Sequence, residues 1–567
     1  MKAASAAFFM SAALFHLFGF LCFALSWLAY DHYRPWVNFH SEALALLGIG
    51  LLGASRCIAQ PSRFAITPVS AFGVLLIVPV LWLQYATGIS FFVGDALLLS
   101  LYVCGLASAI WLGREYAVAD STNENGLFGI FCVLWLVALC STLIGLLQWL
   151  DLQGFLTVHA VQTDIGDRAM GNLGQPNQLA TLILIGIVTL TWTFERNRIG
   201  FAGIIAGVGF LTLGLVLTQS RAGMLGALTV SVFLIWKTLK FPGRLHPRHI
   251  ASWIVIYGLG LALLPHANEW LLIGDSRSMN VTVDNARATM WRQMMSGIAQ
   301  SPWFGYGWNQ TPAAHAAGSI AVPGSLTYSY AHNVILDVLA WNGVPLGLLI
   351  TGACVWWFVS RGRRVAQTGA IYAMTALIPV VIHSMVEFPF AYSYFLLTAG
   401  LMAGIVEASH VGAQTFKVNV RWVGAMLAIW GVVGSYMVYE YLQIEEDFRV
   451  VRFENLRIGQ TPLEYAPPDI WMLSQMGAML KASRQKATPG MTPEDLENLR
   501  KASLRFPYGA LALRNALALG LNGDPAGATR QMAVIRGMYG AVYYNAAVWV
   551  LREQQSKYPI LSQVITP

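Results

Sequence analysis

The chain has 567 residues, of which 56% are hydrophobic and only 11% are charged, and its formal net charge is +7. Soluble globular proteins carry about 25% charged residues, so this composition excludes an ordinary soluble enzyme and is typical of a membrane protein. The basic residues are spread over many loops without a DNA- or RNA-binding motif, so the charge does not indicate a nucleic-acid partner. The six cysteines lie in or beside apolar runs without metal-ligand spacing, which argues against a zinc site or a disulfide framework.

Apolar runs long enough to cross a bilayer as helices recur along most of the chain. The first has no clear cleavage site and is followed by many others, so we interpret it as a retained helix and not as a signal peptide. The second run, at 43–54, is short for a membrane span. We predict an all-α transmembrane bundle of about thirteen spans, at 6–30, 43–54, 69–87, 91–112, 127–150, 179–194, 201–217, 222–239, 251–273, 333–359, 369–386, 391–406 and 422–442.

The basic residues predict the orientation of these spans. When the spans are joined alternately, most lysines and arginines of the loops fall on one side, and the short loops opposite contain only Arg34, Arg168 and Arg221. The positive-inside rule places the first side in the cytoplasm. We therefore expect a cytoplasmic N-terminus, and an extracytoplasmic loop at 274–331 and tail at 443–567.

Two polar segments precede expected outer helix ends in the middle of the chain. The segment GNLGQPN at 171–177 contains Gln175 and Asn177, and Pro176 suits the first turn of a helix. The segment TQSR at 218–221 forms a very short outer loop in which Arg221 goes against the charge rule. A capped helix and an arginine that snorkels to lipid headgroups are the structural alternatives.

The long outer loop contains a helical segment followed by a turn. Residues 284–299, which begin with Asp284, have helical composition, and Arg287 and Trp291 lie one turn apart on the same face. Trp291 alternatively anchors the helix at the membrane surface. The run PWFGYG at 302–307 predicts a turn that returns the chain to the bilayer.

Two further polar segments lie at expected outer ends of spans. The segment YAHN at 330–333 contains His332 and Asn333, and HSMVEFP at 383–389 contains His383 and Glu387. A single interfacial histidine is commonly structural. Ionisable residues at membrane depth are costly and tend to line a polar cavity, so several of them at one surface indicate a site.

These side chains suit transfer from a diphosphate-linked donor. An arginine donates two hydrogen bonds to phosphate oxygens and stays charged, which fits Arg221 and Arg287 to a diphosphate. A histidine can take the proton of an acceptor hydroxyl, which fits His332. The sequence shows no outer cluster of carboxylates resembling a magnesium or manganese site, so we expect neither metal nor cofactor.

The motifs resemble a known superfamily. Arg221 after its short loop, RATMW at 287–291, PWFGYG at 302–307, and HN at 332–333 with GVPLG at 343–347 resemble the O-antigen ligases and O-antigen polymerases over roughly 172–350. The segments GQPN at 174–177 and HSMVEFP at 383–389 resemble its protein O-oligosaccharyltransferase branch of the PglL type. In that branch a tyrosine is common at the position of Phe388, so any role of a phenol falls to another residue, for example Tyr392 or Tyr394.

The resemblance implies a GT-C-like enzyme in a Gram-negative inner membrane, with its active site and tail in the periplasm. It implies a metal-independent, inverting transfer of a preassembled oligosaccharide from undecaprenyl diphosphate to a serine or threonine of an exported protein such as pilin. Whether His332 would act as a base or only as a positioning hydrogen-bond donor is open. The implied site comprises His332, Arg221 and Arg287 as catalytic residues, Gln175 and Asn177 with the two arginines at the donor, and Glu387, His383, Asn333 and Trp291 in support.

The tail predicts a second domain. Small residues between 502 and 528 have the spacing of packed helical hairpins like tetratricopeptide repeats, which bind partners or here cap the active site. Fewer than three repeats are visible, so the tail should depend on the membrane domain for stability. We therefore predict a transmembrane catalytic domain at 1–442, which includes loop 274–331, and a periplasmic helical domain at 443–567.

Three alternatives remain. An O-antigen ligase would place the glycan on lipid A-core and a polymerase would extend it on its carrier, and the tail and the 383–389 motif argue against both. A transporter or flippase would have its site near the bilayer midplane between repeated halves, whereas the polar motifs gather at one surface.

Overall fold

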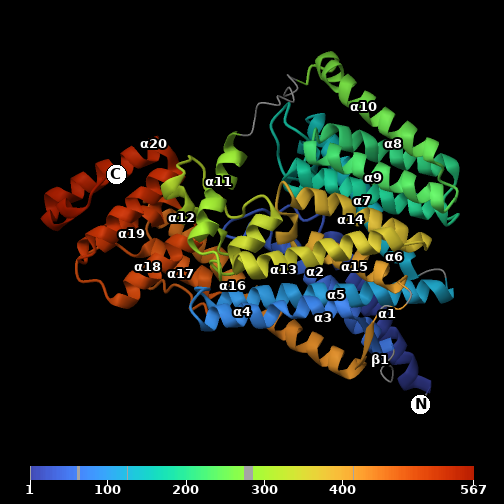
Figure 1. Ribbon diagram of the computed structural model, residues 1–567, viewed down its shortest axis with the longest axis horizontal. Coiled ribbons are helices and arrows are strands. Elements are labelled where there is room, and N and C mark those ends of the chain that lie inside the picture. The colour runs from blue at the N-terminus through green and yellow to red at the C-terminus, as the bar shows by residue number, and fades with distance from the viewer. Residues whose placement is uncertain are drawn as a thin grey trace. The chain divides into compact units, whose positions relative to one another are not determined.

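The computed structural model describes residues 2–59, 64–123, 126–273, 285–410, 412 and 414–566. The described residues form helices joined by loops and one two-stranded ribbon (Figure 1). The chain divides into two compact units. The first unit comprises Met1–Leu76, Leu101–Met279 and Trp356–Val433, and the second unit comprises Ile77–Ser100, Asn280–Val355 and Gly434–Pro567.

The first unit is a helical bundle with an antiparallel ribbon of β1 (Phe64–Pro68) and β2 (Thr415–Asn419), in which Phe64 pairs with Asn419. Its helices are α1 (Lys2–Leu25), α2 (Phe39–Ala59), α3 (Val69–Leu75), α6 (Gly126–Trp149), α7 (Pro176–Glu195), α8 (Phe201–Leu217), α9 (Arg221–Lys240), α10 (Pro247–Trp270), α14 (Thr368–Ser384) and α15 (Ser393–Ala408), with short 3-10 turns η1 (Gln153–His159), η2 (Gly171–Leu173) and η3 (Pro389–Ala391). Helices α5 (Val93–Asn123), α13 (Val334–Arg364) and α16 (Val420–Leu456) contribute residues to both units.

Helix α7 is the centre of the first unit. Every residue from 178 to 194 is buried, because α6, α8, α9 and α14 all pack against this helix. Small residues permit the close approach: a Cβ added to Gly186 would lie 2.3 Å from Cβ of Ala138 in α6, and one added to Gly223 in α9 would lie 2.8 Å from Cβ of Ala180. Glycine and alanine at such contacts are typical of helices that pack within a membrane.

The second unit joins the predicted outer loop to the tail. Its remaining helices are α4 (Ile77–Ala86), α11 (Asn285–Gln300), α12 (Thr311–Ala321), α17 (Ser474–Arg484), α18 (Pro493–Arg505), α19 (Gly509–Leu521) and α20 (Pro525–Lys557), followed by the 3-10 turn η4 (Pro559–Gln563). Helices α11 and α12 pack closely at Gly318, where an added Cβ would lie 1.8 Å from the carbonyl oxygen of Gln293. Helix α12 also contacts α18 and α20, so residues of the loop and of the tail share one compact unit.

The predicted multi-pass helical architecture is confirmed. Among the described residues, nine helical segments are long and apolar enough to cross a membrane, and α1, α8, α14 and α15 are shorter apolar helices at the four other expected spans. The count of thirteen, the orientation, the tetratricopeptide-like tail and the domain boundary at Leu442, which falls within α16, stay predictions. Residues 274–284, with Asp284, lie outside the described residues.

Several expected spans differ from the structure in their bounds, and those at 91–112 and 422–442 continue as helix to Asn123 and Leu456. The short span at 43–54 is the 21-residue helix α2, whose first turn includes the buried Glu42, and the carboxylate of Glu42 accepts a hydrogen bond from the indole of Trp36 at 3.2 Å. The span at 69–87 is divided between α3 and α4 at Leu76.

Candidate functional site

The candidate residues divide between the two units, and each set is described by itself. The first unit contains Gln175, Asn177, Arg221, His383 and Glu387, and the second contains Arg287, Trp291, His332 and Asn333.

In the first unit, the polar residues gather where α7 and α9 begin. Gln175 precedes α7 with an extended backbone, Pro176 is the first helical residue, as the sequence predicts, and Gly174 supplies a left-handed turn with φ of 72°. Asn177 Oδ1 accepts a hydrogen bond from Ser220 Oγ at 2.7 Å. Because Ser220 Oγ also accepts from the backbone N–H of Gly223 and thereby caps α9, the first turns of α7 and α9 are joined.

Two arginines belong to this cluster. Arg221 is the first residue of α9, and it is exposed. Arg168 Nε donates to the carbonyl oxygen of Thr218 at 2.7 Å, and its Nη2 lies 3.5 Å from Asn177 Oδ1. Arg168 was not predicted as a site residue. It shares one signal with Arg221, because both are basic residues in short loops on the side where such loops contain few. Helix N-termini attract anions, so this cluster of two helix starts and two guanidinium groups favours a phosphate ligand.

His383 and Glu387 are buried beside the start of α7. His383 Nδ1 lies 3.0 Å from Thr181 Oγ1, and the same hydroxyl lies 3.0 Å from the carbonyl oxygen of Asn177. Glu387 is 5% exposed, and its backbone N–H donates to the carbonyl oxygen of His383 at 2.8 Å. His383 is therefore placed to support the first turn of α7 through Thr181, and Glu387 follows it just after the end of α14.

A row of aromatic rings continues from this turn. The ring of Phe388 lies 5.7 Å from that of Tyr392, which stacks on Tyr394 at 5.6 Å. The hydroxyl of Tyr394 donates to Gln178 Oε1 in α7 at 2.9 Å. Tyr392 is thus the phenol next to Phe388, while the hydroxyl of Tyr394 holds α7.

The first unit also contains an apolar cavity of about 580 Å³. It is lined by α7, α8, α9 and α10, and it extends from Leu245 and His249 near the start of α10 to Trp149 and Ala267 near its end. The cavity therefore follows nearly the whole length of a membrane-spanning helix, which suits a long apolar chain.

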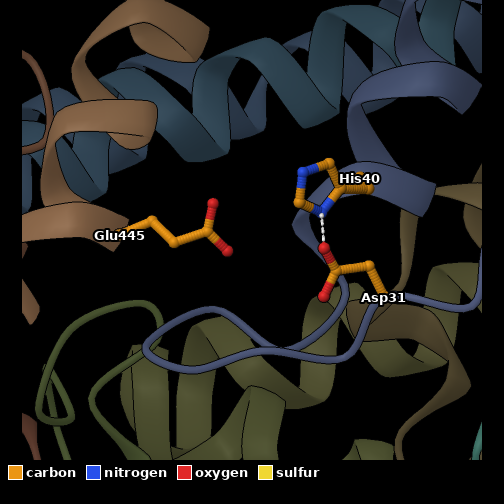
Figure 2. Close-up of side chains that lie close together, drawn as sticks. All are labelled: Asp31, His40 and Glu445. Atoms are coloured by element: carbon orange, nitrogen blue, oxygen red, sulfur yellow. Dashed lines mark ion pairs between the residues drawn. The ribbon is translucent and has the colours of Figure 1, made fainter. Parts of the chain in front are cut away.

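Elsewhere in the first unit, Asp31 Oδ2 lies 3.6 Å from His40 Nδ1, as Figure 2 shows. Glu445, drawn in the same figure, belongs to the second unit. Carboxylate and imidazole groups both bind metals, but a stable site takes at least three protein ligands, so the Asp31–His40 pair carries no metal assignment.

In the second unit, His332 lies in the loop before α13 with a left-handed backbone, φ 51°. Its Nδ1 lies 3.0 Å from the carbonyl oxygen of Tyr330. A carbonyl oxygen only accepts, so Nδ1 carries the proton of the neutral imidazole, and Nε2 carries the lone pair. Nε2 is therefore the ring atom able to take a proton from another molecule.

The peptide before His332 is held from both sides. The N–H of Ala331 donates to Asp337 Oδ1 at 2.9 Å, and the carbonyl oxygen of Ala331 accepts from the indole Nε1 of Trp291 at 3.0 Å. Asp337 is fully buried and also accepts from the hydroxyl of Thr311 at 2.7 Å. These contacts hold the histidine in its left-handed conformation.

Asn333 and Arg287 complete the second set. Asn333 Oδ1 accepts from the N–H groups of Ile335 and Leu336 at 3.0 and 3.2 Å, which caps the start of α13. Arg287 is half-buried in α11, one helical turn before Trp291. The second unit thus combines an imidazole of fixed tautomer with a guanidinium on the helix that supports it.

Three protein families match successive parts of the chain. Residues 169–194 match the family described as "Protein glycosylation ligase", 206–351 match "O-Antigen ligase", and 371–554 match "Virulence factor membrane-bound polymerase, C-terminal". Asn177 falls in the first match, Arg221, Arg287 and His332 in the second, and Glu387 in the third.

Two proteins of Acinetobacter baylyi are similar to this chain. A general O-oligosaccharyltransferase is 28% identical over 467 residues, which cover 80% of this chain and 78% of the relative. A ComP-specific O-oligosaccharyltransferase is 24% identical over 385 residues, which cover 66% of this chain and 67% of the relative.

Proposed function

Because this chain is a membrane glycosyltransferase of the O-antigen ligase superfamily, on its protein O-oligosaccharyltransferase branch, we propose that it moves a preassembled oligosaccharide en bloc from undecaprenyl diphosphate to serine or threonine hydroxyls of exported proteins such as pilin. The observation that carries the proposal at the site is the 3.0 Å contact of His332 Nδ1 with the Tyr330 carbonyl oxygen, because this contact favours the tautomer in which Nε2 is the proton acceptor.

In the proposed reaction, the acceptor hydroxyl oxygen attacks the anomeric carbon of the donor sugar, and the bond between that carbon and the phosphate oxygen breaks. Undecaprenyl diphosphate leaves with the bonding electron pair, and the hydroxyl proton passes to Nε2 of His332. Attack from the face opposite the leaving group inverts the anomeric centre.

Arg221 and Arg287 would neutralise the charge that grows on the diphosphate, with Gln175 and Asn177 shaping the donor site. Donors aimed at developing charge are a large source of catalysis, and arginines can supply this charge without a metal. We add Arg168 to the donor set, because its guanidinium lies beside Asn177.

The apolar cavity along α10 is the proposed site of the isoprenoid chain. Its volume of about 580 Å³ and its extent along α10 suit a segment of a long hydrocarbon. The donor cluster at the starts of α7 and α9 belongs to the same unit.

We place the reaction at the periplasmic face of a Gram-negative inner membrane, with loop 274–331 and the tail on that side. The asymmetry of the basic residues supports this orientation. The match to a protein glycosylation ligase family at 169–194 favours a protein acceptor over lipid A-core or a growing O-antigen.

The test is transfer in a reconstituted mixture. Purified protein, an undecaprenyl-diphosphate oligosaccharide and a chelator are combined with either a pilin-like acceptor or lipid A-core. We expect a mass gain on a serine or threonine of the protein acceptor. Glycan on lipid A-core alone would make the protein a ligase, and longer carrier-linked chains without either acceptor would make it a polymerase.

The same assay tests the site residues. Arg221→Ala, Arg287→Ala and His332→Ala should each abolish transfer without loss of membrane insertion, because each removes a charge or a base needed at the reacting atoms. Arg363→Ala is the control: Arg363 is an exposed arginine near the end of α13, on the predicted cytoplasmic side, and its substitution should change the rate less than about twofold. If the control lost activity and the three variants kept it, the assignment would be wrong.

His332→Gln separates two roles of the histidine. A glutamine can donate a hydrogen bond but cannot take a proton near neutral pH, so loss of a base should lower kcat by about 10²- to 10⁴-fold. Retention of most of the activity would instead assign His332 to positioning of the acceptor.

A further inference from the structure

A buried ion pair links the tail to the start of α5 within the second unit. Arg505, the last residue of α18, donates from Nε to Asp95 Oδ2 at 3.0 Å and from Nη2 to Asp95 Oδ1 at 2.9 Å. The side chain of Asp95 is fully buried, and that of Arg505 is 13% exposed. A buried two-point ion pair fixes orientation strongly, because any displacement leaves a charge unpaired.

The pKa of Arg505 fits a permanently charged group. Burial alone lowers this pKa, but the Asp95 carboxylate outweighs burial and raises the pKa above its ordinary value. The guanidinium is thus charged at every pH at which the protein would work.

Asp95 also holds a residue of the loop after α11. Asn309 has a left-handed backbone with φ of 62°, and its Nδ2 donates to Asp95 Oδ1 at 3.4 Å. The other end of the same amide, Oδ1, accepts from the hydroxyl of Tyr330 at 3.1 Å. Asn309 therefore bridges the ion pair to Tyr330.

Tyr330 is the residue whose carbonyl oxygen accepts from Nδ1 of His332. Its side chain is thus anchored through Asn309, while its backbone fixes the histidine tautomer. A contiguous series of contacts joins Arg505 of the tail to the imidazole, through Asp95, Asn309 and Tyr330.

We infer that Arg505 is a positioning residue for His332: the tail, through the Arg505–Asp95 pair, holds Tyr330 so that its carbonyl keeps Nε2 of the imidazole as the proton acceptor. The inference rests on the proposed function for the catalytic consequence, but the effect on the imidazole itself does not depend on it. It gives the tail a part in catalysis beyond binding a partner.

The matched control is a second buried ion pair of the same unit. Arg484 donates to both oxygens of Asp447 at 2.6 and 2.7 Å, and Asp447 is 1% exposed. The further hydrogen bonds of this pair are to Glu454 and Tyr465, away from the series of contacts at 330–332. Arg484→Met therefore removes a comparable pair from the tail without touching the series of contacts.

The experiment compares Arg505→Met, Tyr330→Phe and Arg484→Met in the full-length protein. Three quantities are measured: kcat and KM in the transfer assay, the melting temperature, and the rate at which diethyl pyrocarbonate modifies His332, read by peptide mass spectrometry. Tyr330→Phe removes a single hydroxyl, so it tests the relay even if Arg505→Met folds poorly.

We expect Arg505→Met and Tyr330→Phe to lower kcat about tenfold to a hundredfold, since a small misplacement of a catalytic group has this cost, and to change the modification rate of His332. Arg505→Lys, which keeps the charge without the two-point geometry, should recover part of the loss. Arg484→Met should lower the melting temperature but leave kcat and the modification rate unchanged.

An unchanged modification rate, with losses of kcat that follow the melting temperature alike in Arg505→Met and Arg484→Met, would overturn the inference and leave Arg505 a scaffold residue. Full activity of His332→Ala would instead overturn the proposed role of His332. The modification rate would then still decide whether Arg505 positions the ring.

Discussion

Two histidines of the second unit differ in their surroundings, which distinguish a structural histidine from a candidate catalytic one. His315 in α12 is fully buried, and its Nε2 lies 2.9 Å from Gln293 Oε1, which accepts because the amide nitrogen of Gln293 donates elsewhere. Burial lowers the pKa of His315 to about 4, so the ring stays neutral near pH 7. His332 is only partly buried, and its tautomer is set by a carbonyl.

The pKa of His315 predicts acid sensitivity. Between its ordinary pKa of 6.5 and its folded pKa of about 4, the unfolded chain binds a proton that the folded chain does not. The free energy of unfolding therefore falls as the pH falls through this window, by about 2 kcal/mol at pH 5. Thermal unfolding in detergent should show a larger drop in melting temperature from pH 7 to pH 5 for the wild type than for His315→Gln. Equal drops would contradict the buried, neutral imidazole.

At the scale of residues, the sequence predicts local relations and misses distant ones. Arg287 and Trp291 could be placed on one helix face because helical spacing is local. The Arg505–Asp95 pair joins residues 410 positions apart. The sequence cannot tell whether Asp95 is an exposed charge or is buried against a partner, because that depends on tertiary packing. For the same reason the sequence did not predict Arg168 as a donor-site residue, since only the fold brings its guanidinium beside Asn177.

Among the elements, α8 and α10 provide a matched pair of glycines for testing the cavity. A Cβ added to Gly209 of α8 or to Gly258 of α10 would meet no atom of the described residues within 4 Å, but only Gly209 lines the cavity. Gly209→Trp fills this space without disturbing helix packing, whereas Gly258→Trp places the same ring elsewhere.

Gly209→Trp should raise KM for an undecaprenyl-diphosphate donor about tenfold, which corresponds to about 55 Å² of apolar surface that the isoprenoid no longer buries. A donor with a short isoprenoid should be affected less, and Gly258→Trp should behave as the wild type. KM is measured for both donors in the transfer assay. If the two tryptophan substitutions had equal effects on KM, the cavity would not be the binding site of the isoprenoid.

Hydropathy does not detect helices that are covered by other parts of the protein and not by lipid. The helix at 284–299 is found as α11 with a one-residue shift, because its composition is helical throughout. Helix α12 was not predicted, because its eleven residues are too few for a membrane span and begin with Thr-Pro after a run of turn residues. It is helical because small residues let α11, α18 and α20 surround it.

For the whole molecule, the orientation can be tested with single cysteines in a background that lacks the six native ones. Lys486→Cys lies in an exposed segment between α17 and α18, and Arg363→Cys lies at the exposed end of α13. The positive-inside rule predicts that a membrane-impermeant maleimide labels only the first in intact spheroplasts. Labelling of Arg363→Cys before lysis, with Lys486→Cys protected, would reverse the orientation.

Each unit gathers segments that are far apart in the chain, and this could not be predicted from the pattern of spans. The sequence indicates a break after Leu442, where apolar runs end, yet the compact second unit also takes in Ile77–Ser100. Hydropathy records where the chain meets lipid. It does not record that Gly94 donates its N–H to Ser474 of the tail at 3.0 Å.

The burial of α7 has a consequence for how the chain is made. Helix α14, which covers one side of α7, begins about 190 residues later, so at 5–20 residues per second the ribosome needs roughly ten to forty seconds to supply it. During that interval α7 presents Gly186 and its threonines, Thr181 among them, to lipid or to the insertion machinery. Until α14 is made, α7 must be stabilised by a chaperone of membrane insertion or by early packing against α6. Slow translation of the segment between α7 and α14 would lengthen the exposure of α7 to quality-control proteases.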